Sequence, residues 1–414
     1  MRDAPRTSVP TTVAETARTG ADSVFRYVVR TAEVVPDGVR WRTLSYRDVP
    51  HYDPNLYDGV AGISLFLADY HRVTGDARAR ELAEGALRWC ATPGRPAATE
   101  PTGLHLPHSL YAGTAGLGLA WLRLGLATGD RSALGRAAAL GTDLAGAPVG
   151  PWAELGRGAL GEGLFLLRLW EATDDGDHLA GARRRGEWFS DGALRDAHGC
   201  HWLRVREPGN PRARSLTGLH AGSAGVAHFF LALHEATGEP GWAALASEAA
   251  DTLLRQARPD RPAGRGRNWP YAIGGGGDLA RCQWCAGAPG IGYFFARAYR
   301  ALGEPAYLAA AEGAAATTLA YGDWRRNPSQ CHGLAGSAEV LLELYRATAE
   351  PRWLEAAHDV ARAAMGYRTV TPEEESWPAD EPGSASPAFF TGATGVGHFF
   401  LRLQSPDRLR VPFV

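Results

Sequence analysis

A Gly-x-x-Gly pair followed by an apolar segment occurs seven times in this 414-residue chain, and this internal repeat restricts the possible folds more than any other feature. After each pair, in segments such as VAHFFLALHEATGEP, apolar residues recur at the spacing of an α-helix. A chain of this length would otherwise suggest two or three domains, but one repeated unit predicts a single stacked array. The pairs are Gly59/Gly62, Gly113/Gly116, Gly158/Gly161, Gly222/Gly225, Gly287/Gly290, Gly333/Gly336 and Gly392/Gly395.

A second helical pattern fills the interval between one repeat's apolar helix and the next glycine pair. These segments, such as DARARELAEGALRWC and PRWLEAAHDVARAAMGY, begin with an acidic residue or proline. Both residue types suit the first turn of a helix, the acid through the helix dipole and proline through its fixed φ. Each repeat is therefore predicted to be an antiparallel helix pair.

The two ends of the chain predict that the array closes on itself. The seventh pair is followed by one helical segment, VGHFFLRLQ, which lacks a second helix, and an unpartnered helical segment spans residues 13–33. If this N-terminal helix completes the last repeat, the ring shuts. We expect an all-α, seven-repeat α/α toroid forming a single domain over residues 1–414. A solenoid capped at both ends would show the same pattern.

Three long connectors interrupt the repeats, at residues 198–217, 259–282 and 368–388. The first alternates enough to suggest a β-hairpin. Connectors of this length are often functional, so we expect them to form walls around a site.

Composition and charge exclude several classes of function. All 43 cationic residues are arginine, they are scattered among 45 carboxylates, and the net charge is -2, which argues against nucleic acid as a partner. No apolar stretch approaches the ~20 residues of a membrane span, and the N-terminus lacks an apolar signal core. We therefore expect a cytoplasmic protein. The absence of lysine, with abundant Ala and Gly, hints at a bacterial source.

Loops five and six carry residues that the other loops lack. Cys285 stands two residues before its first glycine, and Cys331 and His332 stand directly before theirs. The repeat places them at the same end of the toroid. Two thiolates and one imidazole form a tetrahedral Zn²⁺ site with one open position, as in catalytic zinc sites. Three small buried side chains are the alternative. Cys282 offers a further alternative, as a fourth ligand or as the partner of Cys285 in a redox pair.

The motifs WCAGAPG and CHGLAG, together with the sevenfold GxxG pattern, resemble the lanthionine synthetase C family of lanthipeptide cyclases. The resemblance covers about Tyr57 to Leu403 and implies zinc held by Cys285, Cys331 and His332. It also implies that the protein joins a cysteine thiol of a dehydrated precursor peptide to a dehydroalanine or dehydrobutyrine of that peptide. A dehydratase would be a possible partner. Zinc would lower the pKa of the thiol, and a general acid must protonate the α-carbon.

The resemblance also suggests the remaining catalytic residues. Arg281 stands where family members carry an arginine, four residues before the first zinc cysteine; a plain loop-capping role is the alternative. The usual histidine directly before the fourth glycine pair is Ala221 here, with His220 one residue earlier as the candidate acid. Glu154 replaces the usual aspartate of loop three, and Ala286 stands where relatives often carry tyrosine.

Several functions compete at this stage. A thioether-forming cyclase is the leading prediction, and a LanC-like enzyme that adds glutathione to dehydroamino acids is the nearest enzymatic alternative. A zinc-stabilised scaffold that binds a dehydratase or a leader peptide is the non-catalytic one. An α/α-barrel glycosidase would need a pair of carboxylates in the lumen, and the sequence offers no convincing pair.

Overall fold

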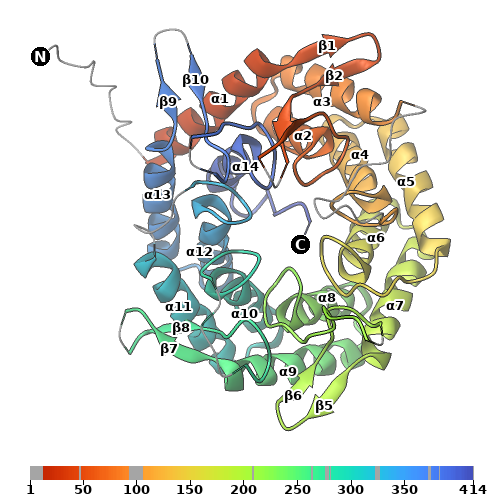
Figure 1. Cartoon of the computed structure of the whole chain (residues 1–414), viewed down its shortest axis with the longest axis vertical. Helices are drawn as coiled ribbons and strands as arrows, with labels where there is room; N and C mark the ends of the chain where they lie inside the picture. The colour runs from red at the N-terminus through yellow and green to blue at the C-terminus, as the bar shows by residue number, and fades with distance from the viewer. Residues whose placement is uncertain are drawn as a thin grey trace, which may run out of the picture.

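The computed structural model describes residues 13–45, 48–92, 106–207, 209–262, 264–275, 279, 281–321, 327–371, 374–381 and 383–413. These residues form two concentric rings of helices around one axis (Figure 1). The inner ring consists of α2 (Val60–Thr74), α4 (Thr114–Thr128), α6 (Ala159–Thr173), α8 (Ser223–Thr237), α10 (Ala288–Leu302), α12 (Leu334–Thr348) and α14 (Ala393–Gln404). The outer ring consists of α1 (Val13–Thr31), α3 (Ala77–Cys90), α5 (Arg131–Gly146), α7 (Gly176–Asp191), α9 (Pro240–Gln256), α11 (Pro305–Ala320) and α13 (Pro351–Met365).

The ring is closed, which confirms the predicted α/α toroid. Each inner helix contacts the next inner helix along the chain, and the last one, α14, contacts the first one, α2. The N-terminal helix α1 packs against α14 and α13, in the place of the outer helix that the seventh repeat lacks. It ends at Thr31, because Glu33 already begins strand β1.

The helix ends follow from residues that recur in each repeat. The outer helices after α1 begin at an acidic residue whose carboxylate accepts a backbone amide, such as Asp76 from Ala79 N at 3.0 Å, or carry proline in their first turn. Four inner helices end at a glycine in the left-handed conformation: Gly75, Gly129, Gly238 and Gly303. The sharp turns between inner and outer helices are therefore encoded locally.

The second glycine of each pair permits close packing between neighbouring repeats. A Cβ built on Gly290 would lie 2.0 Å from the carbonyl oxygen of Trp284 in its own loop and 2.9 Å from the Cβ of Leu219 in the preceding repeat. The second glycines of the other pairs face the same kind of contact with a carbonyl of their own loop. Any side chain here would separate the loops at one end of the toroid.

Short antiparallel hairpins lie in the connections between the helices. The strands are β1 (Glu33–Val35), β2 (Gly38–Arg40), β3 (Thr43–Leu44), β4 (Pro50–His51), β5 (Leu194–Asp196), β6 (Gly199–His201), β7 (Arg258–Asp260), β8 (Gly266–Asn268), β9 (Thr369–Val370) and β10 (Glu375–Ser376). The hairpin β5–β6 begins before the predicted connector 198–217, and within that connector Leu203 and Ser215 form an isolated antiparallel bridge.

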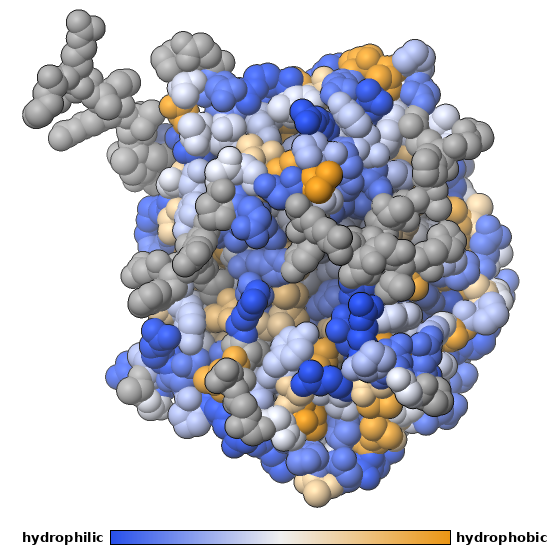
Figure 2. Space-filling model, in the orientation of Figure 1, coloured by the Kyte–Doolittle hydropathy of each residue, from blue (hydrophilic) through white to orange (hydrophobic). Residues whose placement is uncertain are grey.

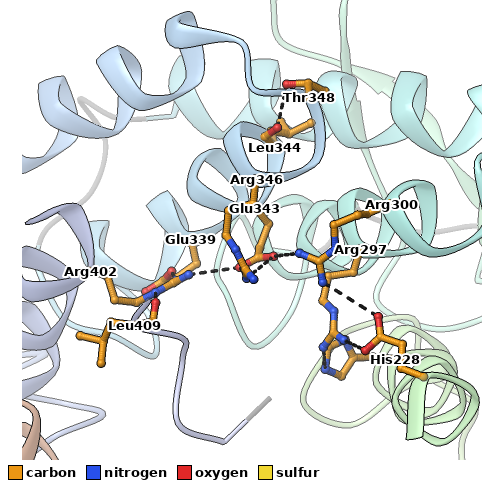
Figure 3. Close-up of polar contacts among 11 residues, drawn as sticks. His228, Arg297, Arg300, Glu339, Glu343, Leu344, Arg346, Thr348, Arg402 and Leu409 are labelled. Carbon is orange, nitrogen blue, oxygen red and sulfur yellow. Dashed lines mark hydrogen bonds and ion pairs between the residues drawn. The ribbon is translucent and has the colours of Figure 1, made fainter. Parts of the chain in front are cut away.

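An ion-pair network connects the inner helices α8, α10, α12 and α14 (Figure 3). Glu343 on α12 accepts hydrogen bonds from Arg346 (2.9 Å) and from the fully buried Arg402 of α14 (3.1 Å). Arg297 of α10 bonds with His228 of α8 at 3.1 Å. Each buried charge or imidazole named here thus has a partner, which offsets its loss of hydration.

The C-terminal segment runs inside the ring, where Figure 1 marks the end of the chain. The Leu409 carbonyl accepts a hydrogen bond from Arg402 Nε at 3.0 Å. Leu409, Val411 and Phe413 are each only 2% exposed, so this segment is packed inside the ring. The Phe413 ring reaches Trp284 (5.4 Å between centroids) and Phe390 (4.6 Å), at the level of the glycine loops.

None of the described helices is long and apolar enough to cross a membrane. On the face viewed in Figure 1, Figure 2 shows mostly hydrophilic residues with small, separate hydrophobic patches.

Candidate metal centre

Seven residues that stand two positions before the first glycine of each repeat gather around the axis of the toroid. We call this set the axial ring. Its aromatic members pack together, with ring centroids 4.6 Å apart for Tyr57 and Tyr111 and 5.1 Å apart for Tyr57 and Phe390. The members in chain order are Tyr57, Tyr111, Gly156, His220, Cys285, Cys331 and Phe390.

Backbone hydrogen bonds connect neighbouring loops of the axial ring in a cyclic pattern, with the amide of one loop donating to a carbonyl of the next. These bonds join Tyr57 N to Tyr111 O (3.3 Å), Tyr111 N to Gly156 O (2.9 Å), Leu155 N to His220 O (2.7 Å), His220 N to Cys285 O (3.1 Å), Cys331 N to Phe390 O (2.8 Å) and Phe390 N to Tyr57 O (3.1 Å). Cys285 and Cys331 are both described, and no backbone bond joins them; their side chains meet instead, with the two sulfurs within 4.8 Å of each other.

The predicted metal ligands lie together at this junction. Within the described part of the chain, Cys285, Cys331 and His332 are the one group of at least three potential ligands, with their ligand atoms all within 4.8 Å of one another. Cys331 is 3% exposed, whereas Cys285 and His332 are half-buried. The group therefore has a buried side and a side that a ligand can approach.

The electrostatics of the three groups favour one ionised thiol. A hydrogen bond from Cys331 holds the pKa of the Cys285 thiol well below its usual value, against the effect of burial, with support from His332. The same hydrogen bond, together with burial, raises the pKa of Cys331 well above its usual value. Burial lowers the pKa of His332, but hydrogen bonds with Asp380 and Cys285 outweigh it, so that the pKa lies well above 6.5.

Asp380 orients the His332 imidazole from the third long connector. Its Oδ2 lies 2.5 Å from His332 Nδ1, its Oδ1 accepts a hydrogen bond from the Ser329 hydroxyl, and its carbonyl accepts one from Asn327 Nδ2 at 3.2 Å. With Nδ1 engaged by a carboxylate, Nε2 is the nitrogen left to bind a metal. Two soft sulfurs and an imidazole oriented in this way fit Zn²⁺.

Comparison with known proteins identifies the family of this chain. Residues 50–414 match the family described as "Lanthionine synthetase C-like protein". The chain belongs to this lanthionine synthetase C-like family. The resemblance found in the sequence is thereby confirmed.

Solved structures share the fold of this lanthionine synthetase C-like chain at low sequence identity. "Nisin cyclase" superposes with a TM-score of 0.66 at 15% identity, covering 94% of each chain. A sugar epimerase from a ruminal bacterium gives 0.54 at 12% identity, covering 96% of this chain and 100% of the other. D-mannose isomerase gives 0.50 at 12% identity, covering 95% of this chain and 100% of the other. The toroid therefore occurs in proteins with different named activities.

His220 lies next to the candidate metal ligands. Its amide donates to the Cys285 carbonyl, its ring packs 5.2 Å from that of Tyr111, and its Nε2 is buried without a hydrogen-bond partner among the described residues. Burial lowers the pKa of the His220 imidazole, and the nearby charge of Glu154 partly opposes this effect.

Glu154 is fully buried close to His220. Its carboxylate accepts hydrogen bonds from Arg157, at 2.9 Å, and from Arg204. Burial raises the pKa of this carboxyl, but the charges of His220, Arg157 and Arg204 outweigh it, so the pKa falls below its usual value. Glu154 is therefore a carboxylate, suited to balance positive charge nearby rather than to donate a proton.

Arg281 lies on the wall of a cavity of about 250 Å³ that reaches the candidate metal ligands at His332. The cavity is also lined by Asp380 and Gln283, and by Leu44 and Ser45 beside the first hairpins. Arg281 is exposed, so its charge is available to a ligand that enters the cavity. The third connector contributes Asp380 to this wall, as its length suggested.

Sequence reasoning missed three residues at this site. The Tyr57 hydroxyl forms a hydrogen bond with the Cys331 sulfur, Tyr111 stands between Tyr57 and His220, and Asp380 supports His332. A comparison of all seven loops at the position occupied by Cys285 would have found both tyrosines. Asp380 could not be found in this way, because it lies in a connector and has no equivalent position in the other repeats.

Proposed function

We propose that this lanthionine synthetase C-like chain is a zinc-dependent cyclase that forms thioether rings. Its substrate would be a dehydrated precursor peptide supplied by a dehydratase in the cytoplasm, and the reaction would add a cysteine thiol across the double bond of dehydroalanine or dehydrobutyrine. The observation that carries this proposal is the convergence of Cys285, Cys331 and His332, with ligand atoms within 4.8 Å of one another.

Cys285, Cys331 and His332 would hold the zinc ion and leave one coordination position for the substrate. A bound zinc ion would lower the pKa of an incoming thiol and keep its thiolate reactive at neutral pH. Asp380 keeps the His332 ring in place through the hydrogen bond at Nδ1. The half-buried Cys285 and His332 form the side from which the peptide enters.

His220 would carry the proton of the reaction. The addition forms a carbon–sulfur bond at the β-carbon, while the electron pair of the double bond moves toward the α-carbon and its carbonyl. His220 accepts the proton that the thiol releases and returns it to the α-carbon, so that no net proton is consumed. Its buried Nε2 has no hydrogen-bond partner among the described residues, so no protein group occupies the nitrogen that would carry the proton.

Glu154 would stabilise the charge on His220, and Arg281 would bind the peptide substrate. The Glu154 carboxylate stabilises the positive charge that His220 acquires in the course of the transfer. Arg281, exposed in the cavity beside His332, would bind the peptide through a carbonyl or carboxylate oxygen.

Metal analysis of the purified protein tests the first requirement of the proposal. We expect about one zinc per chain in the wild type, lost in Cys331→Ala and retained in Cys90→Ala, which removes a buried cysteine on α3 outside the ligand group. Retention of zinc by Cys331→Ala would refute the ligand assignment.

Incubation with a dehydrated peptide, with and without glutathione, tests the reaction. Ring closure leaves the peptide mass unchanged and removes an alkylatable thiol, whereas addition of glutathione increases the mass. A cyclase gives the first result in both incubations. A glutathione adduct would favour the alternative enzyme, and no product with intact peptide binding would favour a scaffold.

A further inference from the structure

Tyr111 holds a fixed position in the axial ring, between the first repeat and His220. Its ring centroid lies 4.6 Å from that of Tyr57, 4.7 Å from that of Phe390 and 5.2 Å from that of His220. The residue is 5% exposed, and its amide donates to the Gly156 carbonyl at 2.9 Å. Contacts on three sides therefore leave the phenol ring little freedom.

Gly156 provides the space in which Tyr111 and His220 lie side by side. A Cβ built on Gly156 would lie 2.5 Å from Tyr111 Cδ2 and 2.8 Å from His220 Nε2. Gly156 occupies the axial-ring position of the third repeat, where other repeats carry a side chain. Its missing side chain thus brings a phenol and an imidazole from the second and fourth repeats into contact.

The two tyrosines of the axial ring differ in what their hydroxyls do. The Tyr57 hydroxyl forms a hydrogen bond with the Cys331 sulfur. The Tyr111 hydroxyl is buried and has no hydrogen-bond partner among the described residues. A buried hydroxyl without a partner is costly and uncommon, so it calls for an explanation such as a ligand that satisfies it.

The surroundings of Tyr111 keep its phenol protonated. Burial raises the pKa of Tyr111 well above 10, and the nearby charges of Cys331 and Cys285 raise it further. Tyr111 belongs to the same axial ring as Cys285 and Cys331, and its ring lies 5.2 Å from that of His220. A protonated phenol in a buried site is a strong hydrogen-bond donor to an oxygen that gains negative charge.

We propose that the Tyr111 hydroxyl is a catalytic hydrogen-bond donor that binds the carbonyl oxygen of the dehydroamino acid while sulfur adds to its β-carbon. This inference rests on the proposed cyclase function and assigns to it a residue from the second repeat. It also explains the unpartnered hydroxyl, whose partner is the substrate itself.

The donor acts at the step in which charge develops. As the thiolate sulfur forms its bond with the β-carbon, the π electrons of the carbon–carbon double bond move onto the carbonyl oxygen and form an enolate. Tyr111 keeps its proton and stabilises this oxygen by hydrogen bonding. The enolate then takes a proton at the α-carbon from His220, which received it from the thiol, so that protons and electrons balance.

Steady-state kinetics of ring closure by Tyr111→Phe test this assignment. We expect kcat to fall about 100-fold, as for the loss of one oxyanion donor, with an unchanged KM and an unchanged zinc content. Tyr70→Phe, which removes a hydroxyl bonded to Asp22 on the outer side of α2, should keep the wild-type rate. Tyr57→Phe should instead weaken zinc retention, since it removes the hydrogen bond to Cys331.

Each other outcome overturns the inference. An unchanged kcat in Tyr111→Phe would show that the hydroxyl does not act on the substrate. Loss of zinc or of the folded state in proportion to the loss of rate would show a structural role. If the wild-type protein with zinc forms no thioether, the proposed function fails as well, whereas an active wild type with an equally active Tyr111→Phe rejects this inference alone.

Discussion

The carboxylate of Asp380 holds the imidazole of His332 from the third connector, and this contact should control metal affinity. Asp380→Asn keeps the shape of the side chain but removes the charge that orients and polarises the ring. We expect the affinity for zinc to fall about 10–100-fold. Competition with a chromophoric chelator measures this affinity.

Glu381→Gln is the matched control for Asp380→Asn. Glu381 lines the same cavity, is exposed, and should leave the affinity for zinc unchanged when neutralised. Equal effects of the two substitutions would mean that only the general negative charge of the cavity matters, and that Asp380 does not position the ring.

Glu154 should make the stability of the fold depend on pH. The pKa of its carboxyl is lower in the folded protein than the ordinary value of 4.5, so its contribution is present above that value and is lost as pH falls through the folded-state pKa. Glu154→Gln should lower the free energy of unfolding on the order of 2 kcal/mol at neutral pH, since Arg157 and Arg204 lose their counter-charge.

Denaturant unfolding between pH 7 and pH 3 measures this effect. The difference between wild type and Glu154→Gln should shrink as the solution becomes more acidic. Glu248→Gln removes a carboxylate from an exposed pair with Arg195 and should change stability little. A difference that stays constant down to pH 3 would contradict the assignment of Glu154 as a buried carboxylate.

At the residue scale, what the sequence could predict depended on the repeat. Cys285, Cys331 and His332 stand at fixed distances from glycine pairs, so the helix that follows each pair places them at one end of the toroid. Tyr111 stands at an equally fixed distance, but a tyrosine before an apolar helix resembles any core residue. Its role becomes visible only with its neighbours, because an unpartnered hydroxyl is a property of the packed structure.

At the scale of single elements, the glycine pairs allow each loop to pass close to the inner helix that directly follows it. Gly290→Ala would place a Cβ 2.0 Å from the Trp284 carbonyl oxygen, one residue before Cys285. The loop must shift, so we expect a loss of about 1–3 kcal/mol in the free energy of unfolding, together with weaker zinc binding. Thermal unfolding and zinc titration measure the two effects.

Gly135→Ala provides the control for a glycine within a helix. Gly135 lies inside α5, and a Cβ at this position would have no neighbouring atom within 4 Å, so alanine should stabilise the protein by about 0.5–1 kcal/mol. If Gly290→Ala were equally harmless, close packing would not explain the second glycine of the pair.

The helices could be predicted at this scale because their apolar spacing and their end signals agree. The strands could not, since each has only two or three residues and pairs within a local hairpin. The hairpin of β5 and β6 begins four residues before the predicted connector 198–217, and the alternating segment inside that connector forms only an isolated bridge between Leu203 and Ser215.

At the scale of the whole molecule, the closed ring links distant parts of the chain to the candidate metal ligands. The Phe413 ring contacts Trp284, which precedes Cys285, and Phe390, whose carbonyl accepts the Cys331 amide. The C-terminal segment thus supports both thiol-bearing loops from inside the lumen. The sequence indicated seven stacked repeats, but it carried no periodic signal for this segment, whose position depends on the lumen that the ring creates.

Removal of the metal should weaken the toroid at one place in the ring. Backbone hydrogen bonds join the other neighbouring loops of the axial ring, whereas loops five and six are joined there through Cys285 and Cys331 side chains. A metal that binds the folded state alone raises its stability by mass action. We therefore expect a chelator to lower the Tm and to speed amide hydrogen exchange in peptides that cover Trp284–Ala286 and Gln330–Gly333.

Peptides that cover loops one and two, around Tyr57 and Tyr111, should exchange at the same rate with and without chelator, because their backbone bonds do not depend on the metal ligands. Cys331→Ala, which lacks one ligand, should show fast exchange at loops five and six in both conditions. A uniform increase around the whole ring would mean that the metal acts on global unfolding alone. No change at loops five and six would mean that the two thiols hold the junction without an ion.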